Sequence, residues 1–245
     1  MDIVVTNDDG IDAPGIKALQ KAIDSRGIIV APLEHHSGCG HQVTTHKPIT
    51  YQCRSPIEYG IAGTPSDCVR LALSHFCPEV MAVISGINAG GNLGVDVYIS
   101  GTVAAVREAA IHGVRGIAIS QYIKKGLAID WDLAAKLTTM VLEDLLYRPT
   151  KPGTFWNVNL PHLTSDAPPP AMIFCPPSTQ PLPLKYFQEG DAFSYVGEYG
   201  SGNESRELMW MYVFQIILRS HNCIFIKIVY LSKFIKDSDS EYLEK

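Results

Sequence analysis

Short apolar runs alternate along the chain with amphipathic stretches of helical period, and this alternation constrains the fold more than any other feature. It favours a mostly parallel sheet with helices on both faces, because parallel strands need crossover connections. The sequence therefore predicts an α/β fold. Strands are predicted at residues 1–5, 27–31, 80–84, 116–120 and 154–160, with a small hairpin at 49–51 and 59–62. Helices are predicted at residues 14–25, 64–75, 103–112 and 131–147.

The chain changes character after residue 160, which ends the last strand predicted for the core sheet. Residues 161–184 are rich in proline and fit neither helix nor strand. Residues 190–199 fit part of a second hairpin, and residues 233–245 are charged and expected to be disordered at their end. We therefore expect a catalytic core at residues 1–165 and a C-terminal extension at residues 166–245.

Composition narrows the possible partners and the compartment. The formal net charge is only −5 and no Lys/Arg cluster occurs, so a nucleic-acid partner is not expected. The six cysteines form no C-x-x-C pair, fit no zinc site and are expected to be reduced. The longest apolar run, residues 209–218, is too short to span a bilayer, and no signal-peptide pattern is present. These features predict a soluble cytoplasmic protein without a membrane partner.

An acidic doublet, Asp8 and Asp9, directly follows the first predicted strand. Open α/β sheets bind ligands at the carboxyl ends of their strands. Adjacent carboxylates repel each other, and a bound cation relieves that repulsion, with Mg²⁺, Mn²⁺ or Ca²⁺ suited to oxygen ligands. The alternative is structural, with a turn at Asp9-Gly10 and Asp8 capping the next helix. The doublet alone does not decide between the two.

Ser37 and Asn88 also follow predicted strand ends, so we expect them to converge with Asp8 and Asp9 on one edge of the sheet. Two carboxylates, a hydroxyl and an amide suit Mg²⁺ or Mn²⁺ better than zinc, because no histidine or cysteine follows a matching strand end. Solvated loop histidines are commoner than histidines with a chemical role. The loop around Ser37 holds three of them, His35, His36 and His41.

A second candidate site is the segment Ser100-Gly101-Thr102, which opens the helix predicted at 103–112. Free backbone N–H groups at a helix start bind anions such as phosphate, although an N-cap role for Ser100 or Thr102 is the simpler interpretation of the segment alone. The glycine-rich residues 86–94 match neither a Walker A motif nor the dinucleotide fingerprint. A metal beside an anion pocket favours metal-assisted hydrolysis of a phosphate ester.

Seven segments in the first 160 residues resemble the SurE (survival protein E) family of 5′-nucleotidases. The resemblance implies a Rossmann-like core, one divalent cation (Mg²⁺ or Mn²⁺), hydrolysis of nucleoside 5′-monophosphates to nucleoside and phosphate, and a homodimer or homotetramer. The segments are residues 4–11 (VVTNDDGI), 13–16 (APGI), 31–32 (AP), 37–38 (SG), 63–69 (GTPSDCV), 85–90 (SGINAG) and 100–105 (SGTVAA).

The resemblance also implies roles for single residues. One aspartate, Asp9 in preference to Asp8, is expected to orient or deprotonate the attacking water. The metal ligands implied are Asp8, Asp9, Ser37 and Asn88. The residues implied at the phosphate pocket are Asn88, Ser100, Gly101 and Thr102.

Two alternatives remain at this stage: a nucleotide-binding sensor or scaffold without turnover, and a broader phosphatase that acts on polyphosphate. The C-terminal part adds a question about assembly. Residues 197–199 still fit the extended hairpin of the family, but the resemblance is lost from about Ser205 onward. A divergent tail, or one from a shifted reading frame, would impair the expected dimer or tetramer.

Overall fold

The computed structural model describes residues 2–124, 126–175, 184–196 and the strand at 223–230, in which the side chain of Ile226 is described. Several predictions fall outside these residues. They are the apolar run at 209–218, the end of the hairpin at 190–199, and the charged segment at 233–245.

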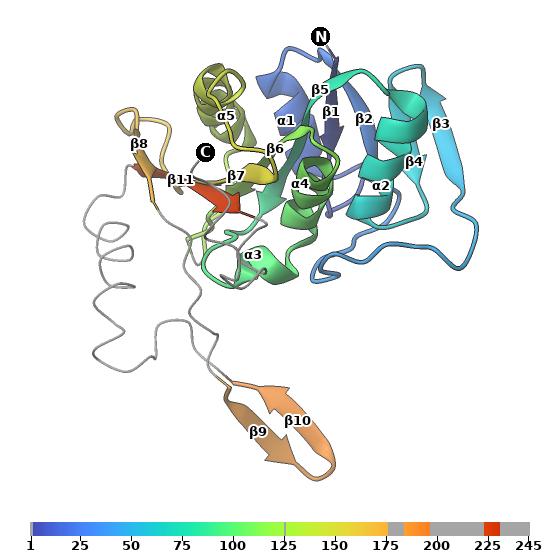
Figure 1. The fold of residues 1–245 in the computed structure, drawn as a ribbon. Coiled ribbons are helices and arrows are strands. Elements are labelled where there is room, and N and C mark those ends of the chain that lie inside the picture. The colour runs from blue at the N-terminus through green and yellow to red at the C-terminus, as the bar shows by residue number, and fades with distance from the viewer. Residues whose placement is uncertain (1, 125, 176–183, 197–222, 231–245) are drawn as a thin grey trace, which may run out of the picture.

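A nine-stranded sheet forms the centre of the molecule, in the order β3-β4-β2-β1-β5-β6-β7-β11-β8 (Figure 1). The neighbouring strands from β4 to β7 pair in parallel, as the alternating sequence pattern predicts, so the predicted fold class is confirmed. The parallel strands are β1 (Asp2–Thr6), β2 (Gly27–Pro32), β4 (Glu58–Ile61), β5 (Val80–Ala89), β6 (Arg115–Gln121) and β7 (Thr154–Leu160).

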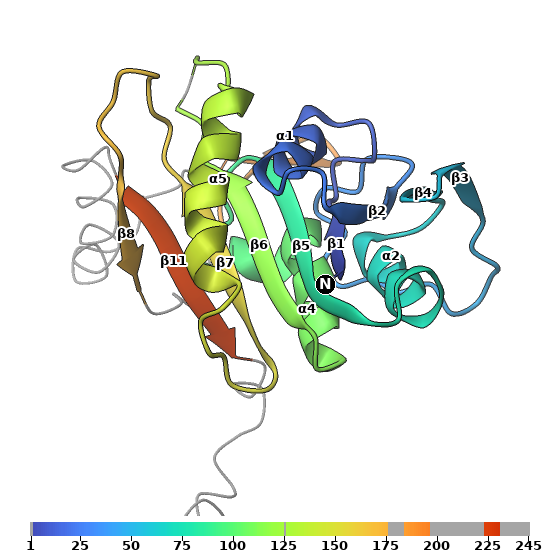
Figure 2. The ribbon, with the colours of Figure 1, turned by 90° about the horizontal axis from the view of Figure 1, so that it is seen from above.

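Helices cover both faces of the sheet (Figure 2). On one face α1 (Pro14–Ala22) packs beside α5 (Trp131–Leu145), and on the other α2 (Pro65–Leu71) packs beside α4 (Gly101–Ile111). Each helix buries an apolar stripe against the sheet, which is the source of most of its stability. A short π-helical turn, η1 (Ala72–Phe76), follows α2, and the short α3 (Asp96–Ile99) precedes α4.

Capping interactions fix the start of α2. The hydroxyl of Thr64 accepts a hydrogen bond from the amide of Asp67 (3.2 Å), and the Asp67 carboxylate accepts one from the amide of Thr64 (3.0 Å). This capping box satisfies two amides that would otherwise be unpaired. Pro65 occupies the first turn, where its missing N–H costs nothing. Thr64 is therefore the N-cap of α2.

Strand β5 is longer than the sequence predicts, because it continues beyond Ile84 to Ala89. After an irregularity the strand pairs again with β6, with Asn88 opposite Ser120. Gly86 makes this passage possible: its φ is +142°, and an added Cβ would lie 2.3 Å from the carbonyl oxygen of Ile119. The polar segment at 85–89 is thus part of the sheet and not a free loop.

Both edges of the sheet carry additional strands. β3 (Tyr51–Ser55) pairs antiparallel with β4, as predicted. At the other edge β11 (Cys223–Tyr230) pairs antiparallel with β7, and β8 (Ala171–Phe174) pairs with β11. The core sheet therefore does not end at β7, and Ile226 of β11 is fully buried in it.

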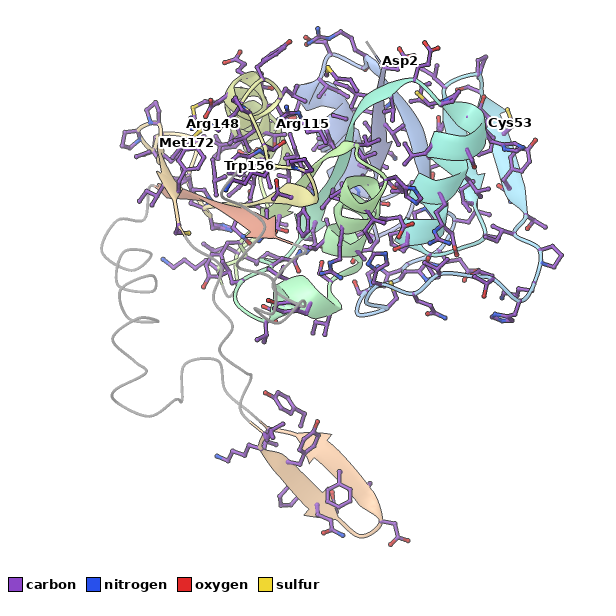
Figure 3. All side chains as sticks on the ribbon, in the orientation of Figure 1. Asp2, Cys53, Arg115, Arg148, Trp156 and Met172 are labelled. Carbon is purple, nitrogen blue, oxygen red and sulfur yellow. The ribbon has the colours of Figure 1, made fainter. Side chains whose placement is uncertain are left out.

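Figure 3 marks these two edges with Cys53 on β3 and Met172 on β8. Arg148 and Trp156 lie on the β8 side, where the Arg148 guanidinium is 4.4 Å from the centre of the Phe174 ring. The ring of Phe174 in turn contacts that of Trp156, with 5.7 Å between their centres. Aromatic and cation–π contacts thus pack β8 onto the core.

A separate hairpin of β9 (Tyr186–Glu189) and β10 (Ala192–Tyr195) stands apart from the large sheet (Figure 1). Its aromatic side chains are largely exposed, with Phe187 58% and Phe193 65% accessible. Such exposed apolar surface marks an interaction site. Within the part of the chain that is described, no helix has the length and apolarity needed to cross a membrane.

Candidate metal and phosphate site

The strand order reverses at β1, which makes this strand the topological switch point of the sheet. In the sheet, β2 and β4 lie on one side of β1, and β5, which follows them in the sequence, lies on the other side. In open α/β sheets, ligands bind in the crevice that forms at such a point, beyond the carboxyl ends of the strands. Asp8 and Asp9 occupy this position, and the amide of Ala89 at the end of β5 donates to the Asp9 carboxylate (3.3 Å).

Asp8 is buried, with 3% of its surface accessible. The hydroxyl of Thr102, at the start of α4, donates a hydrogen bond to its carboxylate. Gly101 lies against the same side chain: a Cβ added to Gly101 would be 2.7 Å from the Cβ of Asp8. The helix start therefore packs directly on the carboxylate, and only glycine leaves enough room for it.

Burial raises the pKa of Asp8, because desolvation penalises the charged form. The hydrogen bond from Thr102 opposes this shift, and the neighbouring charge of Asp9 adds to it. Among the residues that the structure describes, no lysine or arginine forms an ion pair with either aspartate, and the Nδ1 of His35 lies 3.4 Å from an Asp9 oxygen. Two adjacent carboxylates without a compensating charge form a favourable binding site for a divalent cation.

Asp9 is more accessible than Asp8, with 17% of its side chain exposed. Among the described residues, its oxygens are contacted by the amide of Ala89 (3.3 Å) and by the Nδ1 of His35 (3.4 Å). Of the two carboxylates, that of Asp9 is therefore the one free to engage a water molecule.

The structure places Ser37 and Asn88 at the same edge. The amide of His36 donates to the backbone carbonyl of Asp8 (2.7 Å), which brings the exposed Ser37 next to the doublet. The Nδ2 of Asn88 donates to the carbonyl of Gly90 (2.8 Å), so the Oδ1 atom is the part of this amide that remains for a metal. The donor set expected from the sequence thus gathers around one end of β1.

The donor chemistry of these residues fits a hard cation. Within the described ranges, no three His, Cys, Asp or Glu side chains are grouped as a metal site. A cation at the doublet would therefore rely on the hydroxyl of Ser37, the amide oxygen of Asn88 and water for its remaining ligands. Such oxygen ligands suit Mg²⁺ or Mn²⁺.

The segment that opens α4 has defined structural roles. The hydroxyl of Ser100 accepts from the amide of Val103 (3.2 Å), so Ser100 is the N-cap that the sequence allows. Thr102 does not cap the helix, because its hydroxyl binds Asp8. The first backbone amides of a helix have no partner within it, and they attract anions together with the helix dipole. The eleven-residue α4 thus begins beside the doublet as a phosphate site would require.

A buried carboxylate that the sequence does not reveal ties the Ser37 loop to this helix. Glu108 of α4 is 1% accessible and accepts hydrogen bonds from Arg70 Nε (2.6 Å) and His41 Nε2 (2.6 Å), with His112 Nε2 at 3.0 Å. Burial alone would raise its pKa, but these hydrogen bonds and the charge of Arg70 outweigh burial and lower it to about 2. A second tie joins the loop to α3, where the amide of Gly40 donates to the carbonyl of Ile99 (3.0 Å).

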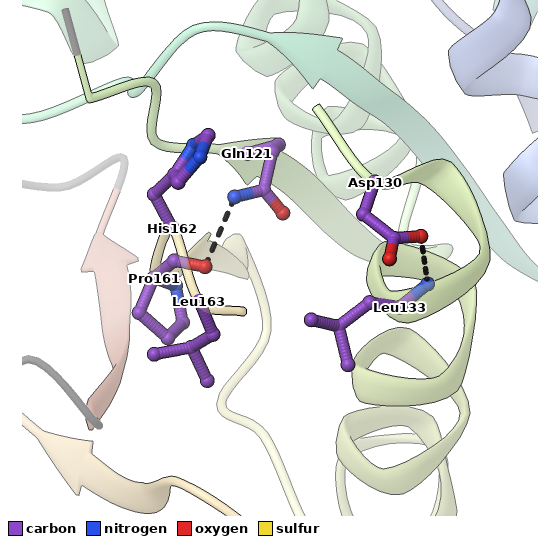
Figure 4. A pocket seen from close by; sticks show the side chains of 6 residues that line it. All are labelled: Gln121, Asp130, Leu133, Pro161, His162 and Leu163. Atoms are coloured by element: carbon purple, nitrogen blue, oxygen red, sulfur yellow. Dashed lines mark hydrogen bonds between the residues drawn. The ribbon is translucent and has the colours of Figure 1, made fainter. Parts of the chain in front are cut away.

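Two cavities lined by described residues lie near this edge of the sheet. The larger has a volume of about 350 Å³ and lies at the carboxyl ends of β2 and β4. The smaller, near His162 and Gln121, has about 10 Å³ and holds at most a single water molecule (Figure 4). In Figure 4 the amide of Gln121 donates to the carbonyl of Pro161 (3.0 Å) across this small space. Only the larger cavity has room for an organic ligand.

Fold and site together define an α/β protein with a Rossmann-like sheet, an acidic doublet at its switch point and a helix start facing that doublet. Residues 3–176 match the family model described as "Survival protein SurE". The chain therefore belongs to the SurE family.

Individual relatives agree with this assignment. A protein of Nostoc sp. named as a candidate 5′-nucleotidase is 62% identical, over 82% of this chain and 89% of that protein. The 5′-nucleotidase SurE of Heliobacterium modesticaldum is 44% identical, over 66% of this chain and 62% of that protein. The crystal structure of the SurE protein from Aquifex aeolicus superposes with a TM-score of 0.80 at 27% identity, and the match covers 100% of both chains.

Proposed function

We propose that this protein is a metal-dependent 5′-nucleotidase that hydrolyses nucleoside 5′-monophosphates to nucleoside and phosphate. Membership in the SurE family and relatives named as 5′-nucleotidases support this activity. The observation that carries the proposal is the packing of α4 on Asp8, because it puts the carboxylate proposed to bind the metal in contact with the helix start proposed to bind phosphate. The relatives named as 5′-nucleotidases favour turnover over a nucleotide sensor.

The proposed ligands of the cation are Asp8, Asp9, Ser37 and Asn88. When bound, a divalent cation at this position would polarise a phosphoryl oxygen and lower the pKa of a bound water. Asp8, held by Thr102, fixes the geometry of the site. Asp9, which is partly exposed, accepts the proton of the attacking water.

The start of α4 would bind the phosphate group of the substrate. The amide of Gly101 and the positive end of the helix dipole would stabilise negative charge that develops on the phosphoryl oxygens. In this arrangement Ser100 fixes the helix start by capping it. Asn88 lies at the end of β5 and is proposed to contact both the cation and the phosphate.

A panel of phosphomonoesters tests the proposal. Purified protein is incubated with AMP, GMP, p-nitrophenyl phosphate and short polyphosphate in Mg²⁺ or Mn²⁺, with an EDTA control, and released phosphate is measured. We expect release from nucleoside monophosphates that EDTA abolishes. Binding of AMP without release would favour the sensor, and release mainly from polyphosphate would favour the broader phosphatase.

Two substitutions test the roles of the doublet. Asp8→Asn and Asp9→Asn should each lower kcat by several orders of magnitude, since each removes a charge from the site. Asp12→Asn is the matched control, because Asp12 lies close in sequence but pairs with Arg54 on the surface (2.6 Å). Near-normal turnover in both doublet variants would refute these roles.

We further propose that residues 1–165 form the catalytic core and residues 166–245 an extension that completes the sheet and forms a homodimer or homotetramer. The exposed aromatic side chains of the β9–β10 hairpin support an interface there. Light scattering after size exclusion tests the assembly, and a stable monomer would contradict it. The mild net charge and the five free cysteines among the described residues support a cytoplasmic enzyme that acts on small nucleotides and not on nucleic acids.

A further inference from the structure

The cavity of about 350 Å³ has the size of a small-molecule site and lies beside the catalytic edge. It opens at the carboxyl ends of β2 and β4, and β2 is the direct neighbour of β1 in the sheet. Ligands of α/β sheets bind along this edge. The cavity is therefore placed to hold a part of the substrate that the phosphate site does not reach.

The lining of the cavity combines apolar and polar residues. Leu33 and Ala62 provide apolar surface, and Leu33 can lie close over β4 because Gly60 has no side chain: a Cβ there would be 2.4 Å from Cδ2 of Leu33. Glu34, Gln42 and other polar residues provide hydrogen-bond acceptors and donors. Ligand pockets typically combine apolar walls with a few placed polar groups in this way.

Internal hydrogen bonds hold the polar wall in place. The hydroxyl of Thr64 donates to the carbonyl of Gln42 (2.6 Å). Two residues further along, the amide and the hydroxyl of Thr44 both bind the carboxylate of Asp67 (2.8 Å each). Because these bonds anchor the loop to the start of α2, the cavity is formed before any ligand binds, which lowers the entropic cost of binding.

The backbone between the cavity and the acidic doublet is a short shared wall. His36 lines the cavity, and its amide donates to the carbonyl of Asp8 (2.7 Å). Glu34 also lines the cavity. The carbonyl group of Glu34 lies close to Gly10, since a Cβ added to Gly10 would be 3.6 Å from it. The cavity and the acidic doublet are therefore neighbours along residues 34–36.

We propose that this cavity binds the nucleoside part of the substrate, with the base against Leu33 and Ala62 and its polar edge and the ribose hydroxyls facing Glu34, Gln42 and Lys47. This assignment rests on the proposed 5′-nucleotidase activity and names the residues that would distinguish a nucleotide from a simple phosphate ester. A small phosphomonoester without a nucleoside uses the doublet and the start of α4 but leaves the cavity empty.

Filling the cavity tests the proposal. Ala62 lines it with an exposed side chain, so Ala62→Leu adds bulk into the cavity without disturbing the core. We measure kcat/KM for AMP and for p-nitrophenyl phosphate with Mn²⁺, and expect the ratio of the two to fall by about tenfold or more. Ala171→Leu is the matched control, because Ala171 is an exposed residue of β8 at the far edge of the sheet, and it should leave the ratio unchanged.

A binding measurement separates this proposal from the hydrolytic one. Adenosine carries no phosphate, so its binding to the wild-type protein by titration calorimetry or ligand-observed NMR should be detectable without metal and weakened about tenfold by Ala62→Leu. Gln42→Ala, at an exposed loop position, should weaken adenosine binding in the same direction without added bulk.

If the wild-type protein binds adenosine in this way but releases no phosphate, the cavity assignment stands and the nucleotidase proposal falls. If AMP is hydrolysed but folded Ala62→Leu and Gln42→Ala change neither the ratio nor adenosine binding, the nucleotidase proposal stands and the cavity assignment is overturned. Absence of adenosine binding in the wild-type protein would also overturn the assignment.

Discussion

Replacing Glu108 with glutamine should destabilise the protein by roughly 3 kcal/mol at pH 7. The pKa of this buried carboxyl group falls from 4.5 to about 2 on folding, which corresponds to roughly 3 kcal/mol of stabilisation of its charged form. Loss of one member of a buried charge cluster typically costs a similar amount. Glu108→Gln keeps the shape of the side chain and removes the charge that holds Arg70 and His41.

The effect should depend on pH in a defined direction. The folded-state pKa lies below the unfolded one, so the stabilisation is fully present above about pH 4.5 and is lost as the pH falls toward 2. The difference between wild type and Glu108→Gln should therefore shrink from roughly 3 kcal/mol at pH 7 to about 1 kcal/mol at pH 3. Urea unfolding followed by far-UV circular dichroism at both pH values measures it.

Asp144→Asn provides the control, because Asp144 forms an i,i+4 ion pair with Arg148 (2.8 Å) at the surface of the molecule. Such a pair contributes about 0.5 kcal/mol or less. The reasoning is refuted if Glu108→Gln costs no more than Asp144→Asn, or if the cost of Glu108→Gln stays constant between pH 7 and pH 3.

Four further outcomes follow from the same contacts. Gly101→Ala should lower kcat by about 100-fold or more, because its methyl group displaces Asp8, and circular dichroism should show an intact fold. Thr102→Val should lower kcat by about tenfold to 100-fold, whereas Thr102→Ser, which keeps the hydroxyl on Asp8, should retain most activity in the same assay. EDTA should abolish phosphate release, and added Mn²⁺ or Mg²⁺ should restore it. Ile226→Ala should cost about 2–5 kcal/mol in urea unfolding, since the side chain is fully buried; a loss below 1 kcal/mol would show that β11 does not pack on the core.

The sequence predicts those features that depend on neighbouring residues. Strand β1 ends where its apolar run ends, and the cap formed by Thr64 and Asp67 follows from a spacing of three residues. The convergence of Ser37 and Asn88 on the doublet was expected for a topological reason, because parallel strands place their carboxyl ends on one edge.

Features that depend on distant residues are not visible in the sequence. Glu108 meets His41 across 67 positions and Arg70 across 38, so no local spacing marks this cluster. The end of β5 was predicted too early because the apolar pattern stops at Ile84, whereas pairing with β6 continues to Ala89. The position of β11 beside β7 likewise requires a pairing between segments about seventy residues apart.

The position of Asp8 ultimately depends on α4 as a whole. The first turn of this helix contacts the carboxylate through Gly101 and Thr102, and its last turns hold the Ser37 loop through the bond between Glu108 and His41. One rigid helix therefore sets both the distance of the phosphate site from the doublet and the position of the Ser37 loop. Loss of the bond to His41 should for this reason weaken metal affinity through Ser37, while the contact of Asp8 with the helix start remains. Metal titration of His41→Ala, followed by an activity assay, measures this loss of affinity.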